Sequence, residues 1–244
     1  MDARRHGVLT RSTLRAYRDR AEAGRRLGEA LESGGLGDAV VLALPRGGVE
    51  IGLHVARAIR APLDVLIVRK LGVPWQPELA LGAVASDEVL LLNQDVIDST
   101  GVSTEEIEEI AATERRELER RETAYRAGRS RVDVRGKTVI LVDDGLATGA
   151  TMRAALVAVR KRAPARVVVA VPVGAAETVR RLELDADQVV CPLVPPFFMA
   201  IGTWYEEFPQ LSDDDVRRLL EEARRLPQQP AGVPAGSGGA VGPS

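Results

Sequence analysis

The chain has 244 residues, of which 45% are hydrophobic, with a net charge of −2 and a pI near 5.9. This composition predicts a folded globular protein, and the near-neutral charge argues against a constitutive nucleic-acid binder. Cys191 is the only cysteine, which excludes an internal disulfide and fits a reducing cytoplasm. No apolar run approaches the roughly 18 residues of a membrane span, so we expect no membrane anchor.

Short apolar runs separated by amphipathic segments follow one another along the chain. The runs are continuous and not alternating, which indicates strands covered on both faces. Strand–helix repetition of this kind predicts an α/β fold, with a Rossmann-like parallel sheet and helices on both faces. The expected strands are residues 39–44, 63–68, 138–142, 166–171 and 187–190. The expected helices are residues 15–33, 49–60, 151–163 and 175–184.

Two segments depart from this alternation of strands and helices. Residues 79–85 and 88–92 are apolar runs flanking a Ser-Asp pair, which indicates a hairpin or two short strands. Residues 102–129 predict one long helix, which begins with a capping box formed by Ser103 and Glu106. Glutamates crowd its first half and arginines its last, as the helix dipole favours. An arginine-rich face could bind RNA, but a solvated helix face is the simpler interpretation.

The stretch VILVDDGLATGAT, residues 139–151, contains the main candidate functional residues. Asp143 and Asp144 end an expected strand at the carboxyl edge of the sheet, where open α/β folds bind ligands. The following turn leads into a helix near Thr151, so backbone N–H groups and the hydroxyls of Thr148 and Thr151 can hold a phosphate. Carboxylates accept hydrogen bonds from ribose hydroxyls and help to hold Mg²⁺. An aspartate N-cap before an ordinary turn is the simpler alternative.

This stretch closely resembles the signature of type I phosphoribosyltransferases, which use phosphoribosyl diphosphate (PRPP). The resemblance implies the type I phosphoribosyltransferase fold and an Mg²⁺ cofactor, which Asp143 and Asp144 would reach mostly through ribose hydroxyls or water. It also implies that these two acids contact the ribose hydroxyls. The loop implied for the 5′-phosphate comprises Ala147, Thr148, Gly149, Ala150 and Thr151.

Two further loops resemble parts of the family's diphosphate site. The turn with Arg46, Gly47 and Gly48 follows the first expected strand and opens a helix. Glycines permit exposed N–H groups, and the arginine supplies charge. Arg69 and Lys70 follow the second strand and resemble the family's Arg-Lys pair. An ordinary turn and a surface charge pair are the respective alternatives.

The segment after Lys70, residues 72–85, loosely resembles the family's mobile loop, which closes over the reaction. Trp75 and Glu78 could face the substrate there or pack on the hairpin.

Aromatic residues gather near the expected base site, in a small C-terminal cap known as the hood. Phe198, Trp204 and Tyr205 could stack on a base, or they could form a small aromatic core. The hood resembles that of 6-oxopurine enzymes, but Ala147 resembles adenine-type enzymes, and residues 167–200 contain no lysine to meet a 6-oxo group. The base is therefore left open, with a purine as one option.

The resemblance covers about residues 15–215, and it is greatest to a bacterial group of predicted phosphoribosyltransferases with a long helical insertion. We expect a single domain over residues 1–225, followed by a disordered, Pro/Gly-rich tail at 226–244. Within this domain, the expected parts are a core at about 37–92 and 132–190, a helical insertion at 93–131 and a hood at 191–211.

The function implied is transfer of 5-phosphoribosyl from Mg·PRPP to a nitrogenous base, with release of diphosphate, in nucleotide salvage. The expected catalytic residues are Asp143, Asp144, Arg46, Arg69 and Lys70. The partners are small molecules, a homodimer is left open, and a PRPP-sensing regulator without turnover is the alternative. A nucleotide-dependent phosphotransferase is disfavoured, because the loop GLATGAT lacks the Walker lysine of a G-K-[ST] motif.

Overall fold

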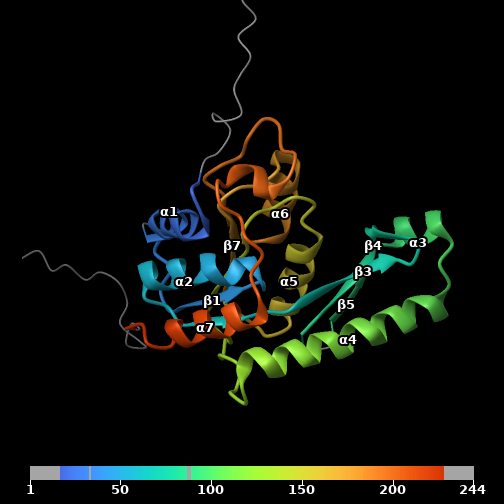
Figure 1. Cartoon of the computed structure of the whole chain (residues 1–244), viewed down its shortest axis with the longest axis horizontal. Helices are drawn as coiled ribbons and strands as arrows, with labels where there is room; N and C mark the ends of the chain where they lie inside the picture. Colours follow the sequence, from blue (N-terminus) through green and yellow to red (C-terminus); the bar gives the residue numbers. More distant parts are fainter. Residues whose placement is uncertain (1–16, 33, 87–88, 228–244) are drawn as a thin grey trace, which may run out of the picture.

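The computed structural model describes residues 17–32, 34–86 and 89–227. A parallel five-stranded sheet forms its centre (Figure 1). The strands of this sheet are β1 (Ala39–Ala43), β2 (Leu63–Val65), β6 (Thr138–Val142), β7 (Arg166–Ala170) and β8 (Gln188–Val190). They lie in the order β2-β1-β6-β7-β8, and every neighbouring pair is parallel. Strand β6, which carries the acid pair at its end, is therefore central.

Helices cover both faces of this sheet, because successive side chains of each strand point to opposite faces. Val41 and Ile140 belong to one core, which includes residues of α1, α2 and α7, whereas Val40 and Leu141 belong to the other, with α5 and α6. The helices are α1 (Arg20–Glu32), α2 (Gly47–Ile59), α5 (Ala150–Arg160), α6 (Ala176–Asp185) and α7 (Asp213–Ala223). The predicted fold class, a parallel α/β sheet with helices on both faces, is confirmed.

A second, antiparallel sheet extends to one side of the main sheet (Figure 1). It consists of β3 (Val68–Val73), β4 (Gln76–Ala85) and β5 (Val89–Leu92), in that order. Strands β4 and β5 are the predicted hairpin, although Asp87 of its turn lies outside the described residues. The single strand expected at 63–68 is wrong, because the chain leaves the main sheet after Val65 and enters the small sheet at Val68.

The segment expected to resemble a mobile loop, residues 72–85, is mostly paired strand. Only Pro74 and Trp75 form the turn between β3 and β4. Backbone pairing on both sides of β4 makes this segment a hairpin arm and not a loop. Trp75, at the tip of this arm, is 62% exposed.

The long helix α4 (Thr104–Arg126) lies along the small sheet (Figure 1). Its predicted capping box is confirmed, since Ser103 Oγ accepts from Glu106 N and the Glu106 carboxylate accepts from Ser103 N. Ile107 and Leu118 of α4 share a core with Leu71 and Val84 of the small sheet. One face of the helix is thus buried against the sheet, while most of its charges remain at the surface.

The hood is completed by the start of the described chain. Tyr17 N donates to Trp204 O at 3.1 Å, and Glu206 N donates to Tyr17 O at 2.9 Å. A 3-10 helix, η2 (Ile201–Trp204), precedes this pairing. Helix α3 (Gln94–Thr100) lies within the predicted helical insertion at 93–131 but was not predicted as a separate helix, and α7 was not predicted from the sequence. Most of the expected tail, residues 228–244, lies outside the described residues.

Candidate functional site

The acid pair lies at the carboxyl edge of the main sheet, directly after β6. Asp143 Oδ1 accepts a hydrogen bond from the backbone N–H of Asp144 at 2.9 Å. The side chain of Asp144 is only 14% exposed. The fold therefore holds two neighbouring carboxylates in a largely desolvated position, which costs free energy unless other groups compensate.

Arg20 of α1 supplies that compensation, and it was not among the residues expected at the site. Its Nε and Nη2 both lie 2.9 Å from Asp144 Oδ2, and its Nη1 donates to Pro209 O at 2.7 Å. The guanidinium carbon lies 3.8 Å from the centre of the Phe208 ring. Arg20 thus joins α1, the acid pair and the hood. An arginine in an amphipathic helix looks like a surface residue, and only the tertiary structure identifies this one as buried.

The two carboxyl groups differ in their electrostatic environment. Burial, together with the neighbouring charge of Asp144, raises the pKa of Asp143 well above its usual value. Burial also raises the pKa of Asp144, but the opposite charge of Arg20 acts against this rise. Asp143 therefore has the stronger tendency to hold a proton in the free protein. A ligand that brings hydroxyl donors or positive charge to the pair would favour its ionised form.

The turn at Arg46 packs directly against the acid pair. A Cβ atom on Gly47 would collide with the carboxylate of Asp144. A Cβ atom on Gly48 would lie 2.8 Å from the carbonyl oxygen of Val142. Glycine is thus required at both positions for this approach. Arg46 is the N-cap residue of α2, and its Nη1 lies 4.0 Å from Asp213 Oδ1.

The loop after the acid pair is fixed by neighbouring segments. Leu146 N donates to Val173 O at 2.9 Å, and Thr178 Oγ1 donates to Ala147 O at 2.6 Å. Gly149 has φ of 75° and caps α5, which begins at Ala150. The unpaired N–H groups of a first helical turn attract anions. Ala147, Thr148 and Thr151 are exposed beside this helix start, whereas Gly149 is buried.

The predicted Arg69–Lys70 pair is divided between two faces of β3. Arg69 Nε donates to Glu114 Oε2 of α4 at 2.6 Å. Since side chains alternate along a strand, Lys70 points to the opposite face. On that face Val68 packs with the core that contains residues of α5, whereas Leu71 packs on the α4 side. Lys70 therefore lies on the same side of the small sheet as the helix that follows the acid pair.

The hood aromatics form a small core. Trp204 is 8% exposed and Tyr205 is 1% exposed. The Tyr205 ring stacks on Phe208 with centroids 4.8 Å apart, and its hydroxyl donates to Asp144 O at 2.6 Å. Phe198 packs against the edge of the core and is partly buried. The aromatic-core interpretation describes Tyr205 and Phe208, and the base-binding roles of Phe198, Trp204 and Tyr205 stay predictions.

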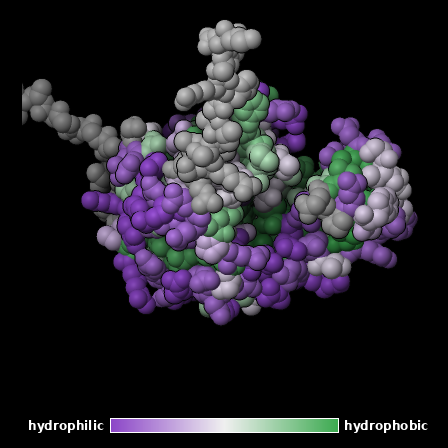
Figure 2. All heavy atoms as spheres, turned by 45° about the horizontal axis from the view of Figure 1, so that its top comes forward, coloured by the Kyte–Doolittle hydropathy of each residue, from purple (hydrophilic) through white to green (hydrophobic). Residues whose placement is uncertain are grey.

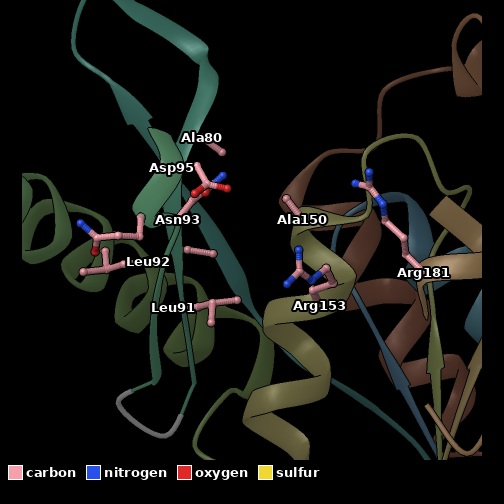
Figure 3. Close-up of a pocket in the computed structure, with 11 residues that line it drawn as sticks. Ala80, Leu91, Leu92, Asn93, Asp95, Ala150, Arg153 and Arg181 are labelled. Carbon is pink, nitrogen blue, oxygen red and sulfur yellow. The ribbon is translucent and has the colours of Figure 1, made fainter. Parts of the chain in front are cut away.

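An open cleft of about 370 Å³ separates the small sheet from α5 and α6 (Figure 3). Figure 2 shows the same face of the molecule hollowed between its two lobes, with hydrophobic residues in the hollow. Arg153 and Arg181 line one wall, while Asn93 and Asp95 line the other. Ala150, the first residue of α5, also borders the cleft. The cleft therefore reaches the helix start expected to bind phosphate.

The cysteine, possible metal ligands and possible membrane spans of the described residues also bear on function. Burial raises the pKa of the Cys191 thiol to about 12, and Sγ lies 3.3 Å from Leu193 O, so this cysteine is unsuited to act as a nucleophile. Within the described ranges no group of three or more His, Cys, Asp or Glu side chains could hold a metal ion. No helix among the described residues is long and apolar enough to span a bilayer.

Comparison with known proteins identifies the family. The family model described as "Phosphoribosyl transferase domain" matches residues 17–205. The chain is 44% identical over 212 residues to the "putative phosphoribosyl transferase" of Mycobacterium tuberculosis strains H37Rv and CDC 1551 / Oshkosh. This match covers 87% of the chain but 48% of each relative, so the chain spans about half their length.

A solved structure gives a closer match in length. The crystal structure of TT1426 from Thermus thermophilus is 45% identical, with a TM-score of 0.74, and the match covers 84% of this chain and 98% of that one. The family model spans α1 and the acid pair, which Arg20 joins. The chain therefore belongs to the phosphoribosyltransferase family.

Proposed function

We propose that this protein transfers the 5-phosphoribosyl group of PRPP to a nitrogenous base and releases diphosphate. The contact between two loops carries the proposal: the carboxylate of Asp144 lies against Gly47, and the acid pair continues into the loop that starts α5. PRPP is a ligand that uses each of these features. Its hydroxyls suit the carboxylates, its 5′-phosphate suits the helix start, and its diphosphate suits the turn at Arg46.

Catalysis in this proposal depends on electrostatic stabilisation of the charges on the ribose and on the leaving diphosphate. Asp143 and Asp144 accept hydrogen bonds from the ribose hydroxyls and offset the positive charge that develops at C1 as the bond to diphosphate breaks. Arg46 and Lys70 attract the leaving diphosphate. Arg69 can contribute only through its Nη atoms, since its Nε is bonded to Glu114. Residues 147–151 hold the 5′-phosphate and so fix the position of C1.

Magnesium fits this site as an ion that arrives on PRPP. One oxygen of Asp144 is bonded to Arg20, and one oxygen of Asp143 accepts the Asp144 N–H, which leaves each side chain one other oxygen. Mg²⁺ prefers few protein ligands and keeps most of its waters and substrate oxygens. Asp143 and Asp144 would thus meet the ion through water or ribose hydroxyls. The bound ion would supply positive charge to the diphosphate.

The acceptor is a nitrogenous base, with a purine as one option, and the reaction serves nucleotide salvage in the cytoplasm. Trp204 and Tyr205 are too buried to stack on a base in the present arrangement of the hood, so they would support the base site from behind. Phe198 is the candidate for stacking, because its ring is only partly buried.

A panel of acceptors tests the proposal. The full chain is incubated with Mg²⁺, PRPP and separate purines, pyrimidines and small nitrogen heterocycles, and both diphosphate and nucleotide formation are followed. We expect one acceptor class to yield nucleotide and diphosphate in equal amounts. The Asp143→Asn/Asp144→Asn double variant should lose this activity. Absence of nucleotide with every acceptor would contradict the proposal.

A regulator that binds PRPP without turnover is the second candidate. The ion pair between Arg69 and Glu114 favours it, because one of the cations expected for diphosphate is already occupied. Such a protein would bind PRPP in calorimetry while the same panel released no diphosphate. If the arginines of α4 contacted RNA, binding to RNA would weaken steeply with salt and respond to PRPP.

A further inference from the structure

A cluster of polar side chains joins the long helix α4 to the turn at Arg46. Asp213, the first residue of α7, is its centre. Asp213 Oδ1 accepts a hydrogen bond from the Tyr125 hydroxyl at 2.6 Å, and Oδ2 accepts from Arg120 Nη2 at 3.3 Å. Arg46 Nη1 lies 4.0 Å from the same Oδ1. Two hydrogen-bond donors of α4 and the more distant guanidinium of Arg46 thus converge on one carboxylate.

The charge of Asp213 is stable in this cluster. The hydrogen bond from Tyr125, followed by that from Arg120, lowers the pKa of Asp213 despite its partial burial. Burial and the charge of Asp213 raise the pKa of Tyr125 to about 12, so the phenol keeps its proton and remains a donor. Tyr125 is 1% exposed and cannot easily turn away. Asp213 is therefore a fixed negative charge beside Arg46.

The distances indicate how Asp213 can act on Arg46. A free arginine side chain populates many rotamers, so ordering it on ligand binding costs conformational entropy. An ion pair at 4.0 Å restricts the guanidinium without forming a hydrogen bond, so it leaves the donors of Arg46 available for a ligand. Arg46 also adjoins Gly47, which touches Asp144. Asp213 therefore restricts the Arg46 guanidinium, while the backbone of Arg46 adjoins the glycine that touches the acid pair.

We propose that Asp213 is a positioning residue for Arg46, and that α4 supports the diphosphate side of the site by holding Asp213 through Tyr125 and Arg120. This inference rests on the proposed function and gives the long helix a role in it. Packing is consistent with this role, since α7 contacts both α2, which Arg46 caps, and α4. Asp213 itself does not touch the substrate.

Binding of inorganic diphosphate tests the inference. Mg²⁺ and diphosphate are titrated by calorimetry into the full-length wild type and the Asp213→Asn variant. We expect a loss of affinity of about tenfold, within the range of coupling between contacting residues. Asp214→Asn is the matched control, because Asp214 lies next in the same helix turn and pairs with Arg217 of its own helix. The control should bind like wild type.

A double-mutant cycle separates positioning from a purely structural role. Arg46→Met should weaken diphosphate binding, and adding Asp213→Asn to it should cause no further loss. If Asp213 acted only through the stability of α7, its effect would persist in the Arg46→Met background. Tyr125→Phe removes only the hydroxyl and should weaken binding in the same direction by a smaller factor. This variant keeps the inference testable if Asp213→Asn does not fold.

The outcomes distinguish this inference from the proposed function. If the wild type binds neither diphosphate nor PRPP, the proposed function fails. If the wild type binds both, but Asp213→Asn and Tyr125→Phe bind diphosphate as tightly as wild type or more tightly, the inference is overturned while the proposed function stands.

Discussion

At the scale of single residues, Arg20 is the side chain on which the acid pair depends most. It is 5% exposed, and both of its bonds to Asp144 are 2.9 Å long. Removing one partner of a buried ion pair costs about 3–5 kcal/mol, because the other charge stays buried and unpaired. We expect Arg20→Met to destabilise the protein by that amount in urea unfolding.

Arg18 provides a matched control for this measurement. It also pairs with a neighbouring aspartate, Asp19 at 2.8 Å, but its side chain is 61% exposed. Exposed pairs are screened by solvent and contribute little, so Arg18→Gln should change the free energy of unfolding much less than Arg20→Met does. Similar losses in the two variants would show that Arg20 is not a buried structural partner of Asp144.

Asp143 gives a prediction that depends on pH. Its pKa is raised in the folded state, so the proton is bound more tightly there than in the unfolded chain. Its contribution to stability is therefore complete below the unfolded pKa near 3.9 and is lost as pH rises through the folded pKa. Asparagine does not titrate. Asp143→Asn should thus stabilise the metal-free protein at pH 7–8, raising Tm by roughly 2–4 °C per kcal/mol gained.

This gain should shrink towards zero as the pH is lowered to about 4, where the wild-type carboxyl is protonated in the folded state. Thermal unfolding at a series of pH values, without divalent cations, provides the measurement. A Tm difference between the two proteins that does not vary with pH would contradict the assignment of a raised pKa to Asp143.

At the scale of elements, the sequence predicted those helices and strands whose signals lie in neighbouring residues of the chain. The capping box at Ser103 is a local signal, and the long helix begins there. The main-sheet strands follow from continuous apolar runs, which suit strands buried on both faces. The prediction of one strand at 63–68 was wrong because both sheets require apolar residues. Hydrophobicity therefore does not mark where the chain passes from one sheet to the other.

The cap of α4 can be tested directly. Ser103→Ala removes the acceptor of the Glu106 N–H, and we expect a loss of about 1 kcal/mol in the free energy of unfolding. Ser99→Ala is the control, because Ser99 Oγ only donates to Val96 O at the surface of α3. A null effect of Ser103→Ala would indicate that α4 frays without affecting global stability.

At the scale of the whole molecule, the candidate site joins segments that are far apart in the chain. The acid pair and the loop proposed to hold the 5′-phosphate are contiguous, so the sequence alone was sufficient to propose them. Arg20 and Asp213 reach the site from α1 and α7, more than 60 residues away from Asp144 along the chain, and no local pattern reveals such a contact. Arg69 and Lys70 are split because neighbouring side chains of a strand point to opposite faces, and only the packing of α4 shows that Arg69 is the one that meets this helix.

The proposed function requires that the acid pair and its two adjoining loops form a PRPP site. The decisive measurement is calorimetric titration of PRPP with Mg²⁺ into the wild type and the Asp143→Asn/Asp144→Asn variant. We expect wild-type binding in the range of about 1 μM to 1 mM that is usual for enzyme substrates, and at least about tenfold weaker binding by the folded variant. Undetectable binding by the wild type, or equal binding by both proteins, would contradict this assignment of the site.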